Sequence, residues 1–461
     1  MLAPHSNTAD LEMIASTKRL SDAYYASLLS QSGRERKPSP ICSLYPLERA
    51  PGIISLLAGK PNPTTFPITS LTFSARSPYS SSPADETTYS LTPGELALGL
   101  QYADAAGIKP FLEWCYGLQE ISHGRKKGEG WSVFVGVGSL DLIYKAIHAL
   151  VDYGDPVLIE SPTYSGVLSI FQNLHCNLVD VETDSQGISA ASLRSILENW
   201  PTEKPPAESI CGNNPTGVTA TLERRVEVLK LAHEFDFIIL EDDPYYYLYY
   251  GSELRPPSYF SLEKQILPET GRVLRFDSLS KVFSAGMRLG FASGPEPILT
   301  AIGIHTETST SQTSSLTQMI AYKVLSSWGY DGFKIHTKRL SDFYREKRDV
   351  YQAAMMKYLD GYVEWTQPEA GMFFWFKLKL SNDRDEANDS ESAIRGTAFK
   401  NGVLALPGTV FLPNGSKTAY VRASFSLNTE EEVFEGLRRL RASIIEARGD
   451  SEEIVRPRAE F

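Results

Sequence analysis

The chain contains few of the residues that build disulfide frameworks or metal centres. Its 461 residues include four cysteines and seven histidines. The cysteines, Cys42, Cys115, Cys176 and Cys211, stand singly, and none of the histidines has the spacing of metal ligands. Isolated cysteines without such spacing argue against both a disulfide framework and a zinc site. The sequence therefore predicts a protein without a metal.

Long apolar runs and excess positive charge are also missing. No apolar run has the length that spans a bilayer, which argues against a membrane protein. A formal net charge of −11 makes nucleic acid an unsuitable partner. The first residues include Asp10 and Glu12 and lack the arginine-rich, acid-poor character of a transit peptide, and Ala459–Phe461 form no peroxisomal signal. We expect a cytoplasmic protein.

The most informative segment runs from Ser278 to Gly290. It contains Lys281 among hydroxyl-bearing and small residues, with Arg288 seven positions later. A deprotonated lysine amine attacks carbonyl groups, and a guanidinium binds phosphate. The combination predicts a site for an aldehyde cofactor held by its phosphate, for which pyridoxal 5′-phosphate is the candidate. Taken alone, a lysine in a serine-rich stretch is more often a solvated surface residue, so the prediction depends on the rest of the chain.

Three upstream segments supply what such a cofactor requires. Asn213–Gly217 offers a side-chain amide that can bind the phenolic oxygen of the cofactor. Phe237–Tyr245 is a buried-strand pattern that ends in acids, and a carboxylate at the carboxyl end of a parallel strand can pair with the ring nitrogen and keep it protonated. Phe134–Ser139 is a strand that enters a glycine turn, whose backbone amides can bind phosphate.

In this order, the segments resemble those of the fold type I, pyridoxal-phosphate-dependent class I aminotransferases. Within that class they are similar to the aromatic amino acid and 2-aminoadipate group that includes kynurenine aminotransferase II. The resemblance spans nearly the whole chain, from Arg36–Ile41 through Gly59–Pro63 to Tyr420–Ser426. It implies an α/β fold, with a large domain on a mostly parallel sheet and a smaller α+β domain built from both termini. It also implies transfer of the amino group of an aromatic amino acid or 2-aminoadipate to a 2-oxo acid such as 2-oxoglutarate, by a ping-pong mechanism.

The resemblance implies roles for single residues on the cofactor. Lys281 would form the aldimine and later move the proton of the substrate carbon. Asp242 would face the ring nitrogen, and Tyr245 and Asn214 the phenolic oxygen. The other cofactor contacts would be a stacking tyrosine, a backbone amide and the phosphate-binding side chains, which are Tyr164, Leu140, Ser139, Ser278, Ser280 and Arg288.

The choice of Asp242 among three consecutive acids depends on its three-residue spacing to Tyr245. Its neighbours Glu241 and Asp243 are interpreted as solvated or helix-capping acids.

On the substrate side, the resemblance implies that Arg422 clamps the α-carboxylate as a bidentate fork, which suits the planar guanidinium. Gly59, Asn214 and Tyr164 would also contact the substrate. Arg36 would meet a distal carboxylate or move aside for an aromatic ring. The alternative for Arg36 is a solvated linker charge.

Tyr102 resembles the tyrosine that reaches the phosphate of the neighbouring subunit. The resemblance therefore implies a homodimer with shared active sites.

The length and the 42% hydrophobic content predict a large core and two domains. Apolar strands alternate with helical patterns from about residue 91 to 345, as expected for a parallel sheet covered on both faces. Ser70–Ser90 is predicted to be a loop, and Thr429 with Glu432 forms a capping box before the last helix. The predicted divisions are a disordered start, an N-terminal segment joining the small domain, the large cofactor-binding domain, the C-terminal small domain and a charged tail, at 1–15, 16–75, 76–345, 346–448 and 449–461.

Three positions depart from the family pattern. Leu140 stands where relatives usually have glutamine, which leaves a backbone amide there. Lys204–Gly212 contains paired prolines where relatives have an apolar strand, and proline cannot donate to a strand ladder. Lys60 replaces a residue that is often apolar beside the substrate and would favour acidic side chains.

Three other functions stay open. A carbon–sulfur β-lyase of the same fold would use the same motifs. A regulator that uses this fold as a sensor would need an N-terminal DNA-binding domain, and the residues before Arg36 are too few and not basic enough. A catalytically silent relative is the third, and the complete set of lysine, aspartate and arginine argues against it.

Overall fold

The computed structural model describes residues 18–41, 44–48, 50–57, 59–80, 82, 84–200, 208–211, 214–381 and 389–449. The expectations for residues 1–15, and for the tail beyond Gly449, lie outside the described residues.

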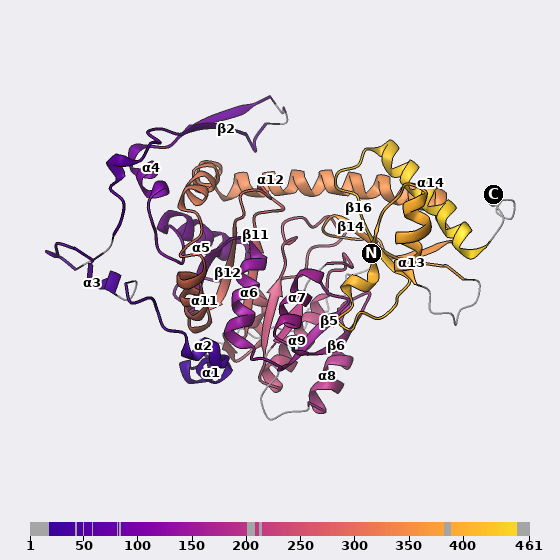
Figure 1. Ribbon diagram of the computed structural model, residues 1–461, viewed down its shortest axis with the longest axis horizontal. Coiled ribbons are helices and arrows are strands. Elements are labelled where there is room, and N and C mark those ends of the chain that lie inside the picture. Colours follow the sequence, from indigo (N-terminus) through magenta and orange to yellow (C-terminus); the bar gives the residue numbers. More distant parts are fainter. Residues whose placement is uncertain are drawn as a thin grey trace, which may run out of the picture.

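An eight-stranded sheet forms the centre of the large domain (Figure 1). Its strands, in spatial order, are β4 (Trp131–Gly136), β12 (Gly290–Pro295), β11 (Val273–Ser278), β9 (Ile238–Asp242), β8 (Glu208–Cys211), β5 (Pro156–Ser161), β6 (Asn177–Asp184) and β7 (Gly187–Ile188). The strands from β11 to β6 pair in parallel, while β12 and β7 run antiparallel to their neighbours. The predicted mostly parallel sheet is confirmed.

Helices cover both faces of this sheet. Successive residues of β9 alternate between two cores, since Ile238 and Leu240 pack on one face and Ile239 on the other. A strand buried on both faces reads as a continuous apolar run, which is the pattern that the sequence shows. The helices of this domain are α4 (Pro93–Leu100), α5 (Lys109–His123), α6 (Ser139–Leu150), α7 (Ser165–Asn173), α8 (Ala190–Glu198), α9 (Leu222–Glu234), α10 (Tyr259–Ile266) and α11 (Glu296–Ser309). Among the described residues, no helix has both the length and the apolar character needed to cross a bilayer.

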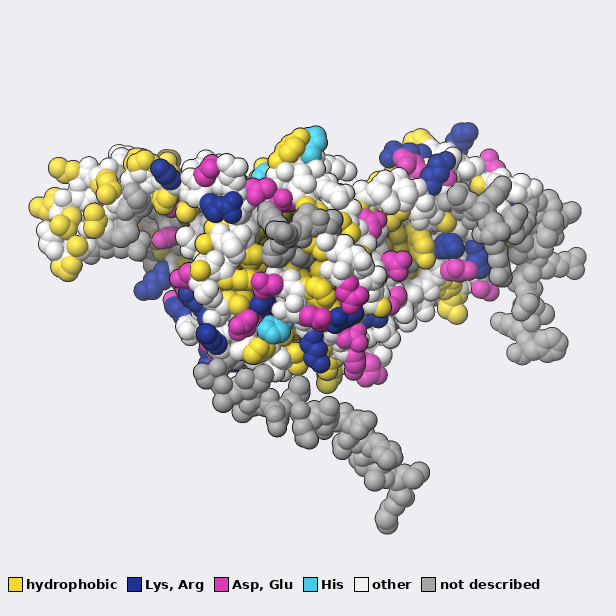
Figure 2. Space-filling model, turned by 90° about the horizontal axis from the view of Figure 1, so that it is seen from below, with side chains coloured by type: hydrophobic (Ala, Val, Ile, Leu, Met, Phe, Trp, Pro, Cys, Tyr) yellow, Lys and Arg dark blue, Asp and Glu magenta, His cyan; other side chains and the backbone are white. Residues whose placement is uncertain are grey.

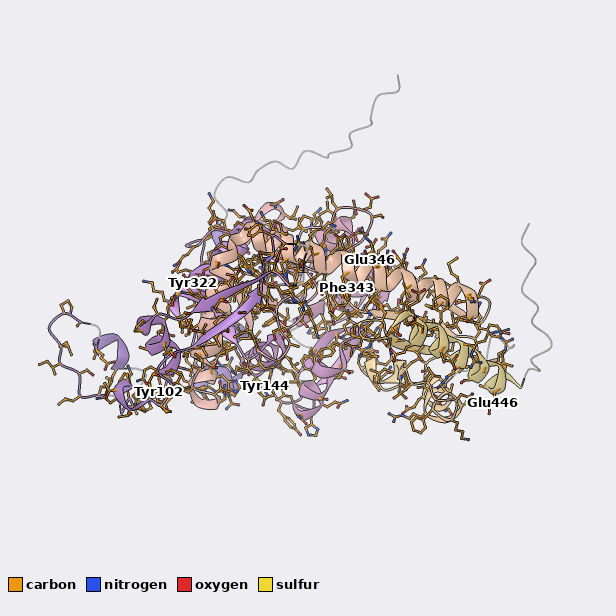
Figure 3. The ribbon with its side chains drawn as sticks, turned by 90° about the horizontal axis from the view of Figure 1, so that it is seen from above. Tyr102, Tyr144, Tyr322, Phe343, Glu346 and Glu446 are labelled. Carbon is orange, nitrogen blue, oxygen red and sulfur yellow. The ribbon has the colours of Figure 1, made fainter. Side chains whose placement is uncertain are left out.

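A long helix, α12 (Ser315–Tyr358), connects the large domain to the C-terminal unit. Phe343 and Glu346 mark this helix in Figure 3, and Glu446 marks the C-terminal unit toward which it runs. It is kinked at Gly329, whose φ of 62° and ψ of −179° are not helical. The unit has its own core and a four-stranded antiparallel sheet. Its elements are β13 (Val363–Trp365), β14 (Phe373–Leu378), α13 (Ser390–Ala393), a π-helical turn (Ile394–Ala398), β15 (Leu406–Pro407), β16 (Tyr420–Ser424) and α14 (Glu430–Arg448). The predicted capping box at Thr429 is confirmed.

The N-terminal segment begins on the large domain. Strand β1 (Lys18–Arg19) pairs with β10 (Glu269–Thr270), and helices α1 (Asp22–Leu28) and α2 (Gln31–Glu35) pack on α11 and α6. The chain then projects from the body as an arm around α3 (Tyr45–Glu48) (Figure 1). We call the described residues from 41 to 71 the arm. The assignment of residues 16–75 to the small domain stays a prediction, because a single chain does not test where a projecting arm docks.

The predicted loop at Ser70–Ser90 is wrong. Thr72–Arg76 (β2) and Glu86–Ser90 (β3) form an antiparallel hairpin. Hydroxyl groups pair across its exposed face, at 3.0 Å between Thr72 Oγ1 and Ser90 Oγ, and Phe73 stacks on Tyr89 on the other face. Threonine and aromatic residues favour a strand. The serine and proline residues of the turn between the two strands obscured this signal.

The unusual segment before Asn214 still contributes a central strand. All four residues of β8 pair in parallel with β9, and Ser209 and Ile210 pair in parallel with β5. The paired prolines Pro205 and Pro206 lie outside the described residues. The described residues of β8 include no proline, and the strand joins β5 to β9 within the sheet.

Candidate active site

A cavity of about 330 Å³ opens where β9 and β11 end and α6 begins. This is the edge of a parallel sheet at which ligands bind, because the loops after neighbouring strands diverge there. The predicted site residues that line it are Ser139, Leu140, Tyr164, Asn214, Asp242, Tyr245, Ser278, Ser280, Lys281, Arg288 and Arg422. Pro244 and Phe373 also line the cavity and were not predicted from the sequence. Phe373 belongs to an aromatic run in β14, Phe373–Phe376, which by itself indicates core packing.

Lys281 lies in the turn after β11 and is half-buried. Burial lowers the pKa of its amine, and the charges of Arg288 and Arg422 lower it further. A lowered pKa increases the fraction of neutral amine, which is the nucleophilic form. Lys281 therefore has the protonation behaviour that attack on an aldehyde requires.

The start of α6 is suited to an anion. Its N-cap is Gly138, at φ 85°, and no side chain of the described residues caps the helix, so the backbone N–H groups of its first turn are available to an anion. Arg288 lies against the same turn, donating to Ser280 Oγ at 3.2 Å and to the Val137 carbonyl at 3.3 Å. Free amides and a guanidinium together form a phosphate-binding arrangement.

Two glycines make this arrangement possible. A Cβ on Gly138 would lie 2.5 Å from Arg288 Nη2, and a Cβ on Gly290 would lie 2.7 Å from the Ser139 nitrogen. Neither position has room for a side chain. The two glycines therefore allow the guanidinium and the strand β12 to approach the amides of the turn.

Asp242 is the buried acid at the base of the cavity. Burial raises the pKa of its carboxyl to about 7, with Asp243 and Asp277 raising it and Arg275 opposing them. Its Oδ1 atom is buried and has no hydrogen-bond partner among the residues that the structure describes. A buried acceptor without a partner costs free energy unless a donor satisfies it. A protonated ring nitrogen is such a donor, so the residues present fit pyridoxal phosphate.

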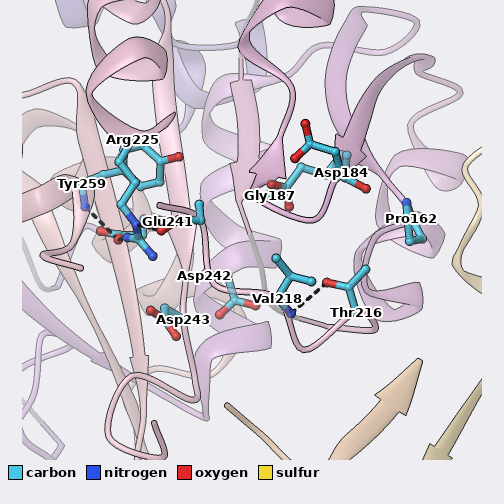
Figure 4. Close-up of a pocket in the computed structure, with 13 residues that line it drawn as sticks. Pro162, Asp184, Gly187, Thr216, Val218, Arg225, Glu241, Asp242, Asp243 and Tyr259 are labelled. Atoms are coloured by element: carbon cyan, nitrogen blue, oxygen red, sulfur yellow. Dashed lines mark hydrogen bonds and ion pairs between the residues drawn. The ribbon is translucent and has the colours of Figure 1, made fainter. Parts of the chain in front are cut away.

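The two acids beside Asp242 are buried as well (Figure 4). The prediction that they are solvated is wrong, whereas helix capping is correct for Glu241, which accepts from the Tyr259 and Phe260 nitrogens at 2.9 and 3.2 Å where α10 begins. Asp243 pairs with Arg255, which lowers the pKa of this carboxyl against the opposing effect of burial. Both acids have cationic partners, which explains how charges so deep in the sheet are tolerated.

The opposite wall of the cavity comes from the C-terminal unit. Arg422 donates to Asn214 Oδ1 at 2.8 Å, and its guanidinium carbon lies 4.0 Å from the centre of the Phe373 ring. These contacts fix the plane of the guanidinium. Tyr245 is buried beside it, and burial raises the pKa of this phenol, which therefore stays a neutral donor.

Three predicted site residues lie outside the cavity of their own chain. Arg36 ends α2 beside His148 and His305, and its charge, after burial, lowers the pKa of both histidines. Tyr102 is 60% exposed, and Gly59 is exposed on the arm. Their roles stay predictions. Within the described residues, no group of three or more His, Cys, Asp or Glu side chains is arranged to hold a metal.

Comparisons with known proteins agree with this geometry. Residues 119–440 match the family described as aminotransferase class I and II. The aminotransferase tdiD of Emericella nidulans is 41% identical over 90% of this chain and 94% of its own length. The mitochondrial kynurenine/alpha-aminoadipate aminotransferase of Bos taurus is 35% identical over 92% of this chain and 99% of its own length. The crystal structure of the aminotransferase Aro8 from Candida albicans superposes with a TM-score of 0.83 at 26% identity, covering 94% of this chain and all of that one.

The sheet edge, the cavity lysine and the family match lead to one conclusion. The chain belongs to the class I and II aminotransferases and is an enzyme of fold type I that uses pyridoxal phosphate.

Proposed function

We propose that the enzyme transfers the amino group of an aromatic amino acid or of 2-aminoadipate to a 2-oxo acid such as 2-oxoglutarate. The observation that carries the proposal is that Lys281, after β11, and Arg422, on β16, line one cavity together with Asp242. An amine for the cofactor, an acid for its ring and a guanidinium for a carboxylate are what transamination of an α-amino acid needs. The name of the bovine relative, a kynurenine/alpha-aminoadipate aminotransferase, supports the substrate class.

The cofactor lies, in this proposal, between the start of α6 and the end of β9. When bound, it supplies an aldehyde and an electron-withdrawing ring. Ser139, Ser278, Ser280, Arg288 and the Leu140 amide hold the phosphate, and Tyr164 packs on the ring. Asp242 pairs with the ring nitrogen, while Tyr245 and Asn214 bind the phenolic oxygen. Lys281 holds the aldehyde and moves the proton at the substrate α-carbon, for which its lowered pKa suits it.

Arg422 binds the α-carboxylate. Its orientation by Asn214 and Phe373 leaves the remaining guanidinium donors to form a bidentate pair with the substrate. Any α-amino acid satisfies this contact, so discrimination comes from the distal end of the cavity. Substrate contacts of Gly59 and Arg36 belong to that end.

The test of the function is product analysis. The purified enzyme, incubated with phenylalanine or 2-aminoadipate and with 2-oxoglutarate, should form glutamate and the matching 2-oxo acid in equal amounts. A cysteine conjugate as the substrate separates the rival β-lyase, which would release pyruvate, ammonia and a thiol without consuming 2-oxoglutarate. Glutamate formation from neither donor would contradict the proposed substrates.

Arg36→Ala tests the distal end. If Arg36 meets a distal carboxylate, its loss should lower kcat/KM for 2-aminoadipate. The corresponding loss of transition-state stabilisation should be about 1.5–3 kcal/mol, the size of a charged hydrogen bond. The kcat/KM for phenylalanine should change little. Because Arg36 lies outside the cavity of its own chain, this contact would be made in the cavity of a partner subunit.

Lys37→Ala is the matched control, since Lys37 is the adjacent, exposed cation. It should leave both donors unaffected. Equal losses on both donors in Arg36→Ala, or no loss on either, would rule out the assignment.

We propose that two copies form a homodimer with shared sites. The arm exposes Ile54 by 90% and Leu56 by 97%, and apolar side chains gather at that end of the molecule (Figure 2). Tyr102, which is also exposed, lies at the end of the molecule from which the arm projects (Figure 3). A contiguous group of exposed apolar residues is typical of a surface that another chain covers.

Subunit mixing tests the sharing. The Tyr102→Ala and Lys281→Ala enzymes, measured separately, should each have little or no aminotransferase activity. After subunit exchange, one site of the mixed dimer would have both natural residues, and activity should return to about one quarter of the wild-type value. If Tyr102 serves the cavity of its own chain, the mixture would stay inactive.

A further inference from the structure

Lys145 is a buried cation that the proposed chemistry does not use. It lies on α6 and is 2% exposed, although lysine is among the residues that are least often buried. Its Nζ donates to Asp141 Oδ2 at 2.9 Å, one helical turn away, and to Thr310 Oγ1 at 3.4 Å, at the end of α11. A lysine held so deeply with one acid indicates a specific electrostatic role.

Asp141 connects this cation to the phosphate-binding turn. The Oδ2 atom that accepts from Lys145 also accepts from the Val137 nitrogen at 3.1 Å. The Val137 carbonyl in turn accepts from Arg288 Nη2 at 3.3 Å. Asp141 therefore fixes the turn from Val137 to Ser139, and both Ser139 and the adjacent Arg288 line the cavity.

The same carboxylate presents an electrostatic problem. Asp141 lies two residues after Ser139, in the first turn of the helix that the phosphate approaches. A negative charge there favours the helix end but repels a phosphate dianion. The ammonium of Lys145 offsets that charge at a distance of 2.9 Å, and because the lysine is 2% and the aspartate 20% exposed, solvent screens the pair only in part.

We propose that Lys145 is a positioning residue for the cofactor phosphate. It neutralises Asp141, so that this acid holds the Val137–Ser139 turn without repelling the phosphate. The inference rests on the proposed placement of the phosphate at the start of α6. It assigns a function to a pair that lies outside the lining of the cavity.

Lys145→Met tests the role through binding. The dissociation constants of pyridoxal phosphate and of pyridoxal, which lacks the phosphate, are measured by titration of the apoenzyme. The variant should bind pyridoxal phosphate about tenfold or more weakly, because the uncompensated charge of Asp141 then repels the phosphate. Its affinity for pyridoxal should be unchanged, because the amine and the ring contacts remain. A merely structural role would weaken both ligands alike.

Two further variants keep the test decisive if Lys145→Met folds poorly. Asp141→Asn removes the repelling charge and leaves an acceptor for Val137, so it should bind pyridoxal phosphate at least as tightly as the wild type. The double variant Asp141→Asn with Lys145→Met should recover the affinity lost in Lys145→Met. Weaker phosphate-ester binding in Asp141→Asn, or no recovery in the double variant, would overturn the inference.

Lys323→Met is the matched control. Lys323 forms a pair of the same length with Glu95, between α12 and α4, and neither residue lines the cavity. It should leave both dissociation constants unchanged, and a selective loss of phosphate-ester binding in this variant too would overturn the inference. Failure of the wild type to attach pyridoxal phosphate at Lys281 would instead contradict the proposed cofactor site.

Discussion

Lys281→Ala is expected to abolish turnover, lowering kcat by more than about a thousandfold, while the protein still folds. The amine is asked both to hold the cofactor aldehyde and to move the substrate proton, and general acid–base catalysis alone contributes two to four orders of magnitude. Its side chain is half-buried in a turn after β11, so its removal leaves the core of the sheet intact. Steady-state kinetics and thermal unfolding measure the two effects.

Chemical labelling supplies the control for this expectation. Borohydride reduction of the wild-type holoenzyme should fix the cofactor on Lys281, as peptide mass analysis would show. Lys145, the buried lysine on α6, should carry none. Reduced cofactor on any lysine other than Lys281 would contradict the placement of the site.

Asp242→Asn is expected to lower kcat by about two orders of magnitude or more, with a modest loss of cofactor. Preorganised charge at a reacting group is worth that much, and the phosphate contacts, which hold most of the cofactor, are untouched. Asp243→Asn should be milder in kcat, since Asp243 faces Arg255. It should be more costly in stability, because Arg255, whose side chain is only 10% exposed, loses the carboxylate that neutralises it. A larger loss of kcat in Asp243→Asn than in Asp242→Asn would show that the acid is misassigned.

Asp242→Asn is also expected to change how the stability of the apoenzyme depends on pH. The pKa of Asp242 is about 7 in the folded protein and 3.8 as the reference value. The folded state therefore binds more protons between these values, and stability falls as the pH rises from about 4 to 7. The Tm of apo Asp242→Asn should exceed that of apo wild type at pH 8, and the difference should shrink at pH 4. An equal pH dependence in the two proteins would contradict the buried, unpartnered carboxyl.

The sequence predicted the cofactor side of the cavity because that side is built from local motifs. Asn214, Asp242 and Lys281 each stand next to a turn or the end of an apolar run, and parallel strands bring such ends to one edge. Phe373 escaped prediction because an aromatic residue in a strand reads as core. The burial of Glu241 and Asp243 also escaped, since their cations Arg225 and Arg255 are recognisable only in three dimensions.

Among the larger elements, the hairpin β2–β3 was missed because its exposed strands carry hydroxyl residues instead of an apolar stripe. The course of the arm could not be predicted either. Ile54 and Leu56 have no partner surface within a single folded unit. Their position depends on contacts that periodicity along one chain does not encode.

The division of the cavity between two folded units bears on how such an enzyme changes over evolutionary time. Lys281, Asp242 and the residues proposed to hold the phosphate lie at the edge of the large sheet, whereas Phe373 and Arg422 belong to a separate sheet with its own core. Substitutions in the second core that spare the contacts of Phe373 with Tyr245 and of Arg422 with Asn214 leave the first core unperturbed, because distant sites without shared contacts act almost independently. A lineage can therefore explore new amino acids as substrates by drift in the C-terminal unit, while the cofactor chemistry is inherited unchanged.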